Sequence, residues 1–561
     1  MGRGWPGTSR TSHSAGDIIH YLNFGAFVSE GEVAWAIGSL PLGKAGGLDG
    51  IPHELWRHLA DKHEKLSKVN KPSCNVYRML SLVFNDIHNH GSHPTLEFSD
   101  GWMCPIYKKK DRTDIANYRP ITVLNADYKI FTKLLTKRLT QAAPKLIHKD
   151  QAGFITGRHA TDHTELANLV IRSCTVKEIN GAIISLDQEK AYDRVMHDFL
   201  WKTLDKLNFP PRFTSLIRSL YESARTTVII NGVQSPKYDI CRGVRQGDPL
   251  SCLLFNLAIE SLACMIRKSE LLGLSLSARC EPIKLTLFAD DTTVFLSEND
   301  DVTTLNSILD KWCTASGAKF NTEKTIIIPV GTHGYRQQAI ESRKLNPASI
   351  SFPPNLRIAR DGEPVRILGC FVGNNVEQEA IWTPTVDKIV DSLAQWSKSH
   401  PTIMGRRLII NMEVAGRTQY LTYVQGMPPN IEKRLSKLTA DFIWDNRSSH
   451  PINLPTLDKP LNDGGLKLLN LKARNEAIEL RKVRSFLNFD QRPTWSYLAD
   501  DLYSHNSSVS TLAVNDKSRL NPFLQAWCPK TSGKYCTLPD SLIRMFRTAK
   551  KYQVALAPIA M

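Results

Sequence analysis

The chain has 561 residues, 42% of them hydrophobic, which is long enough for several domains and too apolar for a disordered chain. Its formal net charge of +16 favours a polyanionic partner, nucleic acid before a membrane surface. Half of that excess lies in residues 101–160, which contain twelve Lys and Arg against four Asp and no Glu.

The cysteine pattern and the hydropathy indicate in which cellular compartment the protein resides. Eleven cysteines occur without a CxxC pair, a pattern typical of reduced intracellular thiols and not of a disulfide framework. No window holds 18 consecutive apolar residues, and the N-terminus lacks the apolar core of a secretory signal. We therefore expect an intracellular protein, in the nucleus or the cytoplasm, without a membrane span.

The first 52 residues predict a tail, a helix and a glycine-rich loop. Residues 1–28 are rich in Gly, Ser, Thr and Arg with weak periodicity, and we expect a loosely ordered tail there. A helical pattern from Glu32 leads into residues 42–52, where four glycines allow the backbone to approach a ligand closely. A plain connecting loop is an equally good interpretation of these glycines.

The basic segment begins with a predicted strand at residues 102–107, which turns at the lysine cluster 108–110. A helix is predicted next, with an apolar face formed by Tyr128, Phe131, Leu134, Leu135 and Leu139. Its polar side is almost wholly positive, and it carries Lys129, Lys133, Lys137 and Arg138. This pattern indicates a phosphate-contacting surface, with an ordinary solvated face as the alternative.

A pair of histidines follows this helix. His159 and His163 stand four residues apart, the spacing of zinc ligands on one helix face. The sequence around them does not form a recognisable zinc motif, so we interpret both as plain polar residues.

Three aspartates follow strand-like runs in two separate parts of the chain. Residues 181–187 are typical of a buried strand that ends in Asp187, and residues 284–296 indicate a β-hairpin with Asp290 and Asp291 at its tight connection. Neighbouring carboxylates repel each other, and hard oxygen ligands suit Mg²⁺. If the strand pairs with the hairpin, the three carboxylates converge and hold two metal ions. An acidic surface turn is the alternative for the hairpin alone.

The segment between the acidic elements, residues 242–251, predicts a loop followed by a helix. We expect Asp248 as the N-cap and Pro249 at the first helical position. Arg245 and Gln246 are the polar groups that the loop offers to a base pair or a phosphate. Taken alone, this segment is better interpreted as an ordinary helix start.

Together these motifs resemble the reverse transcriptases of the non-LTR (LINE-type) retrotransposons. The resemblance depends on their order: LDQEKAYD at the strand end, RGVRQGDPLS at the loop and FADD in the hairpin. NYRPI, QAGFITGR, residues 316–325 and Ile367-Leu368-Gly369 agree with it. The match runs from about residue 43 to residue 373 and more loosely to 468. Gly46 and Leu48 stand where the family usually has prolines, so we expect a more mobile loop there.

The resemblance implies an α+β fold, a right-hand polymerase with fingers, an antiparallel-sheet palm and a helical thumb. The expected regions are a tail at 1–28, fingers with an N-terminal extension at 29–180, a palm at 181–375 with 199–240 returning to the fingers, a thumb and following region at 376–490, and an unassigned segment at 491–561.

The resemblance also implies the chemistry. The protein would be an RNA-directed DNA polymerase that extends a DNA primer on an RNA template, using deoxynucleoside triphosphates and two Mg²⁺ ions. The implied catalytic residues and metal ligands are Asp187, Asp290 and Asp291. Tyr192 would reject the ribose 2′-hydroxyl. The other implied nucleotide-binding residues are Gln246, Gly247, Arg119, Lys129 and Lys324, and the implied primer grip is Leu368 and Gly369.

Two other functions stay open from the sequence. One is a catalytically inactive RNA-binding remnant of such an element, against which the intact acidic trio argues. The other is an RNA-dependent RNA polymerase, which Tyr192 disfavours because a ribonucleotide polymerase needs room for the 2′-hydroxyl. We expect any endonuclease activity to come from another protein, and the sequence leaves the oligomeric state open.

Overall fold

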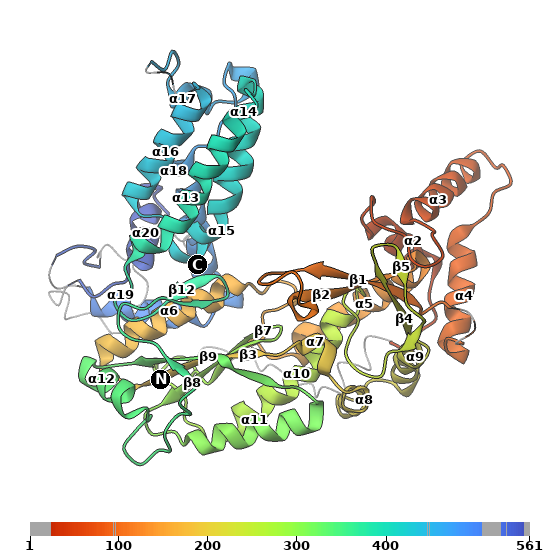
Figure 1. Cartoon of the computed structure of the whole chain (residues 1–561), viewed down its shortest axis with the longest axis horizontal. Helices are drawn as coiled ribbons and strands as arrows, with labels where there is room; N and C mark the ends of the chain where they lie inside the picture. The colour runs from red at the N-terminus through yellow and green to blue at the C-terminus, as the bar shows by residue number, and fades with distance from the viewer. Residues whose placement is uncertain are drawn as a thin grey trace, which may run out of the picture.

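The computed structural model describes residues 24–93, 95, 97–445, 447, 449–507, 529–533 and 536–554. Most of the tail predicted at residues 1–28 lies outside the described residues, as does the interval 508–528. Two arms of the chain diverge from a central body that contains a sheet (Figure 1). The architecture is α+β, as the sequence predicts.

Five strands form the central sheet, in the order β10-β9-β3-β8-β7. They are β3 (Gly181–Gln188), β7 (Leu285–Phe288), β8 (Asp291–Ser297), β9 (Phe320–Val330) and β10 (Arg357–Ile358). β3 pairs antiparallel with both β8 and β9, whereas β10 joins β9 in parallel. The predicted antiparallel sheet is therefore confirmed, with β10 as a short parallel addition.

Alternate residues of β3 enter two separate cores, because successive side chains of a strand point to opposite faces. The even-numbered residues between Ala182 and Leu186 share a core with α10 (Ser251–Lys268) and α11 (Val302–Ser316). Ile183 belongs to a second core that includes α6 (Ala160–Lys177). The strand is thus buried on both sides, which explains why its sequence is apolar without alternation.

A second sheet has the order β2-β1-β4-β5, with β6 paired to β4. Its strands are β1 (Gly101–Tyr107), β2 (Tyr118–Leu124), β4 (Arg225–Ile230), β5 (Val233–Gln234) and β6 (Tyr238–Asp239). β1 pairs antiparallel with β2 and parallel with β4. Because β4 follows β3 in sequence, the chain leaves the central sheet, completes this second sheet and then returns.

Helices accompany both sheets. In the N-terminal arm and beside the second sheet these are α2 (Glu30–Ser39), α3 (His53–Ser67), α4 (Val76–His90), η2 (Ile115–Asn117), α5 (Ala126–Leu146), α8 (His197–Lys206) and α9 (Pro211–Glu222). A short α7 (Ala191–Arg194) follows β3, and α12 (His333–Ser342) follows β9. The long helices α3 and α4 form the outer end of this arm (Figure 1).

Helix α5 is not the open phosphate-contacting surface that its charge pattern predicts. Arg138 is buried, and its guanidinium donates to the Glu32 carboxylate at 2.8 Å and to the carbonyl of Ala26 at 2.8 Å. The ammonium of Lys137 lies 4.2 Å from the centre of the Trp35 ring. The prediction is wrong in this respect because α2 packs along α5 and takes up part of its positive charge.

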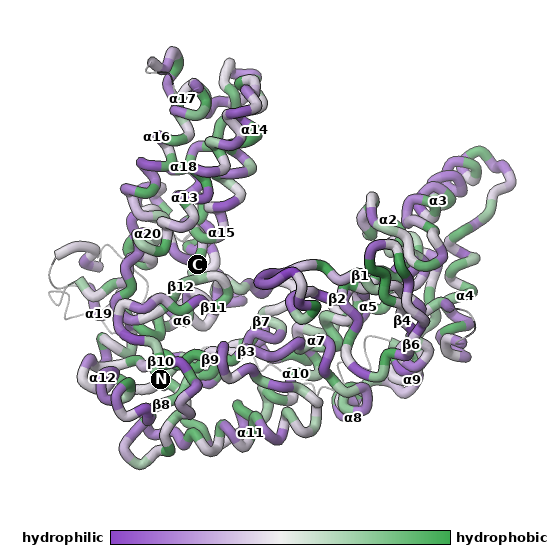
Figure 2. The backbone as a smooth tube through the Cα atoms, viewed as in Figure 1, coloured by the Kyte–Doolittle hydropathy of each residue, from purple (hydrophilic) through white to green (hydrophobic). Residues whose placement is uncertain are grey.

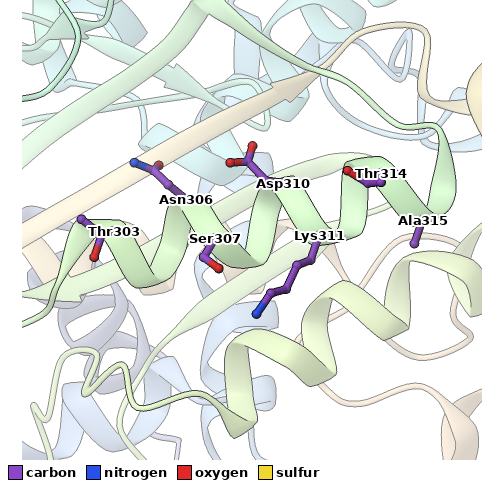
Figure 3. A pocket seen from close by; sticks show the side chains of 7 residues that line it. All are labelled: Thr303, Asn306, Ser307, Asp310, Lys311, Thr314 and Ala315. Atoms are coloured by element: carbon purple, nitrogen blue, oxygen red, sulfur yellow. The ribbon is translucent and has the colours of Figure 1, made fainter.

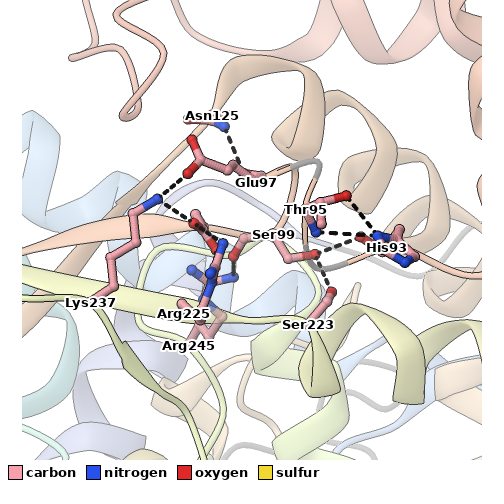
Figure 4. Close-up of polar contacts among 11 residues, drawn as sticks. His93, Thr95, Glu97, Ser99, Asn125, Ser223, Arg225, Lys237 and Arg245 are labelled. Carbon is pink, nitrogen blue, oxygen red and sulfur yellow. Dashed lines mark hydrogen bonds and ion pairs between the residues drawn. The ribbon is translucent and has the colours of Figure 1, made fainter.

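A buried carboxylate joins the second sheet to the loop ahead of α10. Asp100 is fully buried, and it accepts hydrogen bonds from Arg225 at 3.0 Å and Lys237 at 2.8 Å. Figure 4 shows Arg225 and Lys237 together with Ser99 and Arg245. The neighbouring carbonyl of Ser99 accepts a hydrogen bond from Arg245. The start of β1, the strand β4 and residues 237–245 are thereby held together by charge-assisted hydrogen bonds.

The second arm is helical. Its elements are α13 (Gln378–Ser397), α14 (Ile403–Ile410), the π-helical turn η3 (Asn411–Ala415), α15 (Gly416–Gln425), α16 (Pro429–Ile443), α17 (Leu454–Leu457), η4 (Leu461–Asp463) and α18 (Leu471–Phe486). Apolar and polar residues are interspersed along these helices (Figure 2), as is typical of helices with one apolar face. Ile389, Leu435 and Val483 are among the residues that form their common core. No described helix is long and apolar enough to span a lipid bilayer.

The segment that the sequence leaves unassigned, 491–561, contains two described helices at the base of this arm. They are α19 (Trp495–His505), which follows the short η5 (Phe489–Gln491), and α20 (Asp540–Lys551). α19 packs against α6, where Trp495 Nε1 donates to Asp162 at 2.9 Å, and α20 packs against α18. These helices therefore complete the core between the central sheet and the helical arm.

We predict that His163 makes the protein acid-sensitive. Burial lowers the pKa of this imidazole to about 4 from an ordinary 6.5, with Arg158 reinforcing the shift and Asp150 opposing it. The folded state disfavours the charged ring. The free energy of unfolding therefore keeps its full value above pH 6.5 and falls as the pH drops towards 4, by up to about 3 kcal/mol.

Urea unfolding at about pH 7.5 and about pH 4.5 measures this loss. His163→Gln removes the titrating group, so its stability should fall less than that of the wild type over this interval. His90→Gln changes an exposed histidine and is the matched control. Equal losses in the wild type and His163→Gln would contradict the prediction.

Candidate active site

The carboxylates of the predicted hairpin lie at a two-residue turn. β7 and β8 pair antiparallel with Phe288 opposite Asp291, so Ala289 and Asp290 form the turn. Ala289 has a φ of +53°, a left-handed conformation that costs a residue other than glycine about 1–2 kcal/mol. The hairpin predicted at 284–296 is confirmed, and its turn carries backbone strain.

Asp187 lies next to this turn because β3 runs beside β8. The two strands are antiparallel, and Leu186 lies opposite Thr292, the residue after Asp291. On the other side of β3, a β-bulge between Ser185 and Asp187 interrupts the pairing with β9. The pairing of strand and hairpin on which the predicted site depends is therefore present.

The three carboxylates repel one another. Burial, and after it the charge of Asp187, raises the pKa of Asp290. Burial and the charges of Asp290 and Asp187 raise the pKa of Asp291 to about 6, although this residue keeps an exposed edge. Carboxylates in this condition are stabilised in their charged form by a nearby cation.

Basic side chains act on these carboxylates from two directions. Lys324, on β9, places Nζ 2.8 Å from Oδ2 of Asp187. Lys108, directly after β1, and Arg119, on β2, both oppose the increase in the pKa of Asp290. Sequence reasoning singled out Lys324 and Arg119 but treated Lys108 only as part of a lysine cluster. Its place directly after a predicted strand was the available signal.

In this conformation, the described residues include no group of three His, Cys, Asp or Glu side chains close enough to hold a metal ion. The ammonium of Lys324 instead supplies the positive charge at Asp187. The donor set fits a divalent cation nonetheless. All three candidate donors are carboxylates, and a cation would relieve the repulsion that contributes to the raised pKa of Asp290 and Asp291.

Tyr192 lies on α7, and its ring stacks on Phe255 of α10 with 4.7 Å between centroids and 13° between planes. Its hydroxyl is buried and lies against the Cys252 thiol. Burial raises the pKa of this hydroxyl, with Cys252 and the charge of Asp290 contributing. The stacked ring thus lies near Asp290, with its hydroxyl against a thiol and not in water.

The loop ahead of α10 docks tightly on β2 and α7. Gln246 donates from Nε2 to Asp193 at 3.0 Å, and its carbonyl accepts from the Thr122 amide at 2.8 Å. Gly247 has a φ of +121°, and a Cβ there would lie 2.2 Å from the Thr122 carbonyl oxygen. Glycine is therefore required at 247 by both conformation and space.

Arg245 and Asp248 do not have the roles that the sequence predicts. Arg245 is buried, with its guanidinium 5.5 Å from the centre of the Tyr128 ring, so it is not offered to a base or a phosphate. α10 begins at Ser251, and its N-cap Leu250 makes no side-chain capping bond. Asp248 instead accepts from the Leu250 amide at 3.0 Å and the Tyr128 hydroxyl at 3.1 Å. A turn precedes the helix, so its start is displaced along the chain.

Lys129 lies apart from the carboxylates. It is half-buried in α5, where burial lowers its pKa, and the charge that opposes this is Asp49 of the glycine-rich loop. That loop packs on the residue ahead of α5, since a Cβ at Gly47 would lie 2.0 Å from Oδ1 of Asn125. Lys129 is therefore placed beside this loop, whereas Arg119 is placed near Asp290.

Leu368 and Gly369 form the turn of a separate hairpin. β11 (Val365–Ile367) and β12 (Cys370–Val372) pair antiparallel, and the two turn residues have φ of +48° and +79°. Tyr420 of α15 donates to the Leu368 carbonyl at 2.5 Å. The hairpin is thus fixed to the helical arm.

A hollow of about 690 Å³ lies away from these residues. It lies along one exposed helix, α11, whose polar side chains point outward (Figure 3). The residues that line it are Thr303, Asn306, Ser307, Asp310, Lys311, Thr314 and Ala315. None of the predicted site residues contributes to it.

Comparison with known proteins identifies the region of the chain that contains these residues. Residues 107–370 match the family model described as reverse transcriptase (RNA-dependent DNA polymerase), and this span contains every site residue that the sequence predicts. The chain is 28% identical over 483 residues to the transposon TX1 uncharacterized 149 kDa protein of Xenopus laevis, covering 84% of this chain and 34% of that protein.

Two further relatives come from mobile elements. The Pol polyprotein from the type-1 retrotransposable element R2 of Popillia japonica is 30% identical over 233 residues, which is 41% of this chain and 32% of that protein. The RNA-directed DNA polymerase from the mobile element jockey of Drosophila melanogaster is 28% identical over 305 residues, which is 52% of this chain and 31% of that protein. The chain spans about a third of the length of these relatives. Residues 107–370 therefore form a reverse transcriptase domain of the kind found in non-LTR retrotransposons.

Proposed function

We propose that this chain is an RNA-directed DNA polymerase that extends a DNA primer on an RNA template with deoxynucleoside triphosphates. The observation that carries the proposal is the pairing of β3 with the β7–β8 hairpin, which brings Asp187 beside Asp290 and Asp291 within a reverse transcriptase domain. In the reaction, a bond forms between the primer 3′-oxygen and the α-phosphorus, and the bond from that phosphorus to pyrophosphate breaks.

We propose Asp187, Asp290 and Asp291 as the ligands of two Mg²⁺ ions. Bound there, the ions favour loss of the proton from the primer hydroxyl and stabilise the leaving pyrophosphate. The three carboxylates are close enough to affect one another electrostatically, which supports a shared cation site. The Lys324 ammonium, which lies 2.8 Å from Asp187, would be the group that gives a proton to the leaving pyrophosphate.

The remaining side chains recognise the incoming nucleotide. Lys108 and Arg119 project positive charge towards the carboxylates, which supports a role in binding the triphosphate. Tyr192, held by its stacking on Phe255, closes the space beside the sugar where a 2′-hydroxyl would lie. Gln246 and its loop hold the adjoining surface, where the template base pairs. Lys129 is left out of this proposal because it lies beside Asp49.

Asp290→Ala tests the metal assignment. Removing this ligand should lower primer extension by about 1000-fold or more, since a metal at the reaction centre contributes several kcal/mol of charge stabilisation. RNA affinity should stay within about twofold, because contacts to the nucleic acid backbone are spread over many basic residues. The assay is extension of a DNA primer on RNA with Mg²⁺, and filter binding gives the affinity.

Asp310→Ala is the matched control, because it removes a carboxylate from the exposed face of α11. Unchanged extension by Asp290→Ala would refute the assignment. A wild type that binds RNA but adds no nucleotide would favour the inactive remnant.

Tyr192→Ala should relax sugar selection. Loss of the ring opens space for the 2′-hydroxyl, so the preference for deoxynucleotides should fall by about 10-fold to 100-fold, equal to roughly 1–3 kcal/mol of discrimination. Single-nucleotide kcat/KM values for a dNTP and the matching rNTP measure the ratio. Tyr552→Ala, at an exposed tyrosine, should leave it unchanged. A wild type that prefers rNTPs would indicate an RNA polymerase.

Alanine substitutions of Arg119 and Lys129 should have different effects on the KM for dNTP. Arg119→Ala removes a charge near Asp290 and should raise the KM for dNTP by about 10-fold, the worth of one charge-assisted contact. Lys129→Ala removes a charge beside Asp49 and should change this KM by less than about twofold. The reverse order of effects would show that α5 and not β2 contacts the triphosphate.

A further inference from the structure

The turn that carries Asp290 is held by a side chain from a distant part of the chain. Gln151 has no exposed surface and lies between α5 and α6. Its Oε1 accepts a hydrogen bond from the Ala289 amide at 2.8 Å, and its Nε2 donates to the Ala289 carbonyl at 3.1 Å. One side-chain amide therefore satisfies both backbone polar groups of the residue that has the left-handed φ.

The backbone beside Gln151 is fixed to the same sheet edge. β7 is the outermost strand of the central sheet, so its far side is free to pair. The carbonyl of Asp150 accepts from the Leu287 amide at 2.7 Å, and the Ala152 amide donates to the Leu287 carbonyl at 2.8 Å. Gln151 thus forms a parallel bridge with Leu287, two residues before the turn.

Gly153 and Arg158 orient the glutamine. A Cβ at Gly153 would lie 2.3 Å from the Ala289 nitrogen, so only glycine allows this approach. The Gly153 amide donates to Oε1 of Gln151 at 2.8 Å, which settles the orientation of the side-chain amide. Arg158 donates to the carbonyls of Gln151 and Ile147 at 2.8 and 2.9 Å, which ties this segment to the end of α5. The glutamine is therefore placed before any substrate binds.

We propose that Gln151 is a positioning residue of the polymerase site, which holds Ala289 in its left-handed conformation and thereby holds Asp290 and Asp291 where they receive the metal ions. The inference rests on the proposed function. Gln151 acts through the backbone, because its hydrogen bonds go to Ala289 and Gly153 and not to the carboxylates. Without it, the buried amide and carbonyl of Ala289 lose their partners, and the turn has no compensation for its strain.

Gln151→Leu tests the proposal, because leucine keeps the volume and removes both hydrogen bonds. The kcat of primer extension should fall by about 10-fold to 100-fold, and the Mg²⁺ concentration for half-maximal rate should rise by about fivefold or more. The KM for dNTP and the affinity for primer–template should stay within about twofold. Binding of Mn²⁺ to the full chain without nucleic acid, followed by electron paramagnetic resonance, should weaken in parallel.

Rescue separates positioning from general stability. Ala289→Gly removes the cost of the left-handed conformation, so Gln151→Leu/Ala289→Gly should recover most of the lost kcat and Mn²⁺ affinity. Gln151→Glu keeps the acceptor and loses the donor, so it should give an intermediate Mg²⁺ requirement and guards against a leucine variant that does not fold.

Gln425 offers a matched control. Its side-chain amide makes the same pair of bonds to the backbone of Phe371, at 3.0 and 3.1 Å, in the other hairpin. Gln425→Leu should leave the Mg²⁺ requirement and Mn²⁺ binding unchanged.

An equal shift in both glutamine variants, no shift in Gln151→Leu, or no rescue by Ala289→Gly would overturn the proposal. A wild type that binds Mn²⁺ but adds no nucleotide would contradict the proposed function. Comparison of Mn²⁺ binding by the wild type and Gln151→Leu would still test the role of Gln151.

Discussion

Electrostatic repulsion among Asp187, Asp290 and Asp291 is the constraint on which the rest of this structure depends. Backbone pairing of β3 with β8 holds the carboxylates near one another although their charges oppose it. Burial of β3 in two cores supplies the stability that this arrangement requires. Lys324 neutralises Asp187 directly, and Lys108 and Arg119 act on Asp290 from the second sheet. The fold therefore holds the three carboxylates near one another in spite of their repulsion, with basic side chains beside them.

Side chains from elsewhere in the chain bond to the backbone at two hairpins whose turns have a residue with positive φ. Ala289 and Leu368 both have a positive φ, which is unfavourable for residues with a Cβ. Gln151 bonds both backbone groups of Ala289, and Gln425 does the same for Phe371 beside the second turn. A glutamine amide suits this task because it offers one donor and one acceptor in the spacing of a backbone amide. Each turn is thus built as part of the sheet and not as a free loop.

The positive charge of the chain is partly structural. Arg138 and Arg245 belong to segments whose pattern indicates nucleic acid contact, yet both are buried and bonded to backbone carbonyls. Arg245 lies beside the network around Asp100, which joins the second sheet to the loop ahead of α10. That loop also bonds Asp193, the residue after Tyr192, through Gln246, so the same loop connects the second sheet to the proposed nucleotide site. Net charge alone overstates the surface available to an RNA template.

The sequence by itself determined the hairpin at 284–296 and the strand that ends in Asp187, because periodicity, apolar runs and adjacent carboxylates are local properties of the chain. The order of LDQEKAYD, RGVRQGDPLS and FADD along the chain carried the resemblance to the family. Only the tertiary structure decided the orientation of the basic side chains: Arg245 inward, Lys129 beside Asp49 and Lys108 towards the carboxylates. It also revealed that Gln151 holds a turn 138 residues away. Such contacts depend on which elements pack together across the whole fold, and no local pattern of residues encodes that packing.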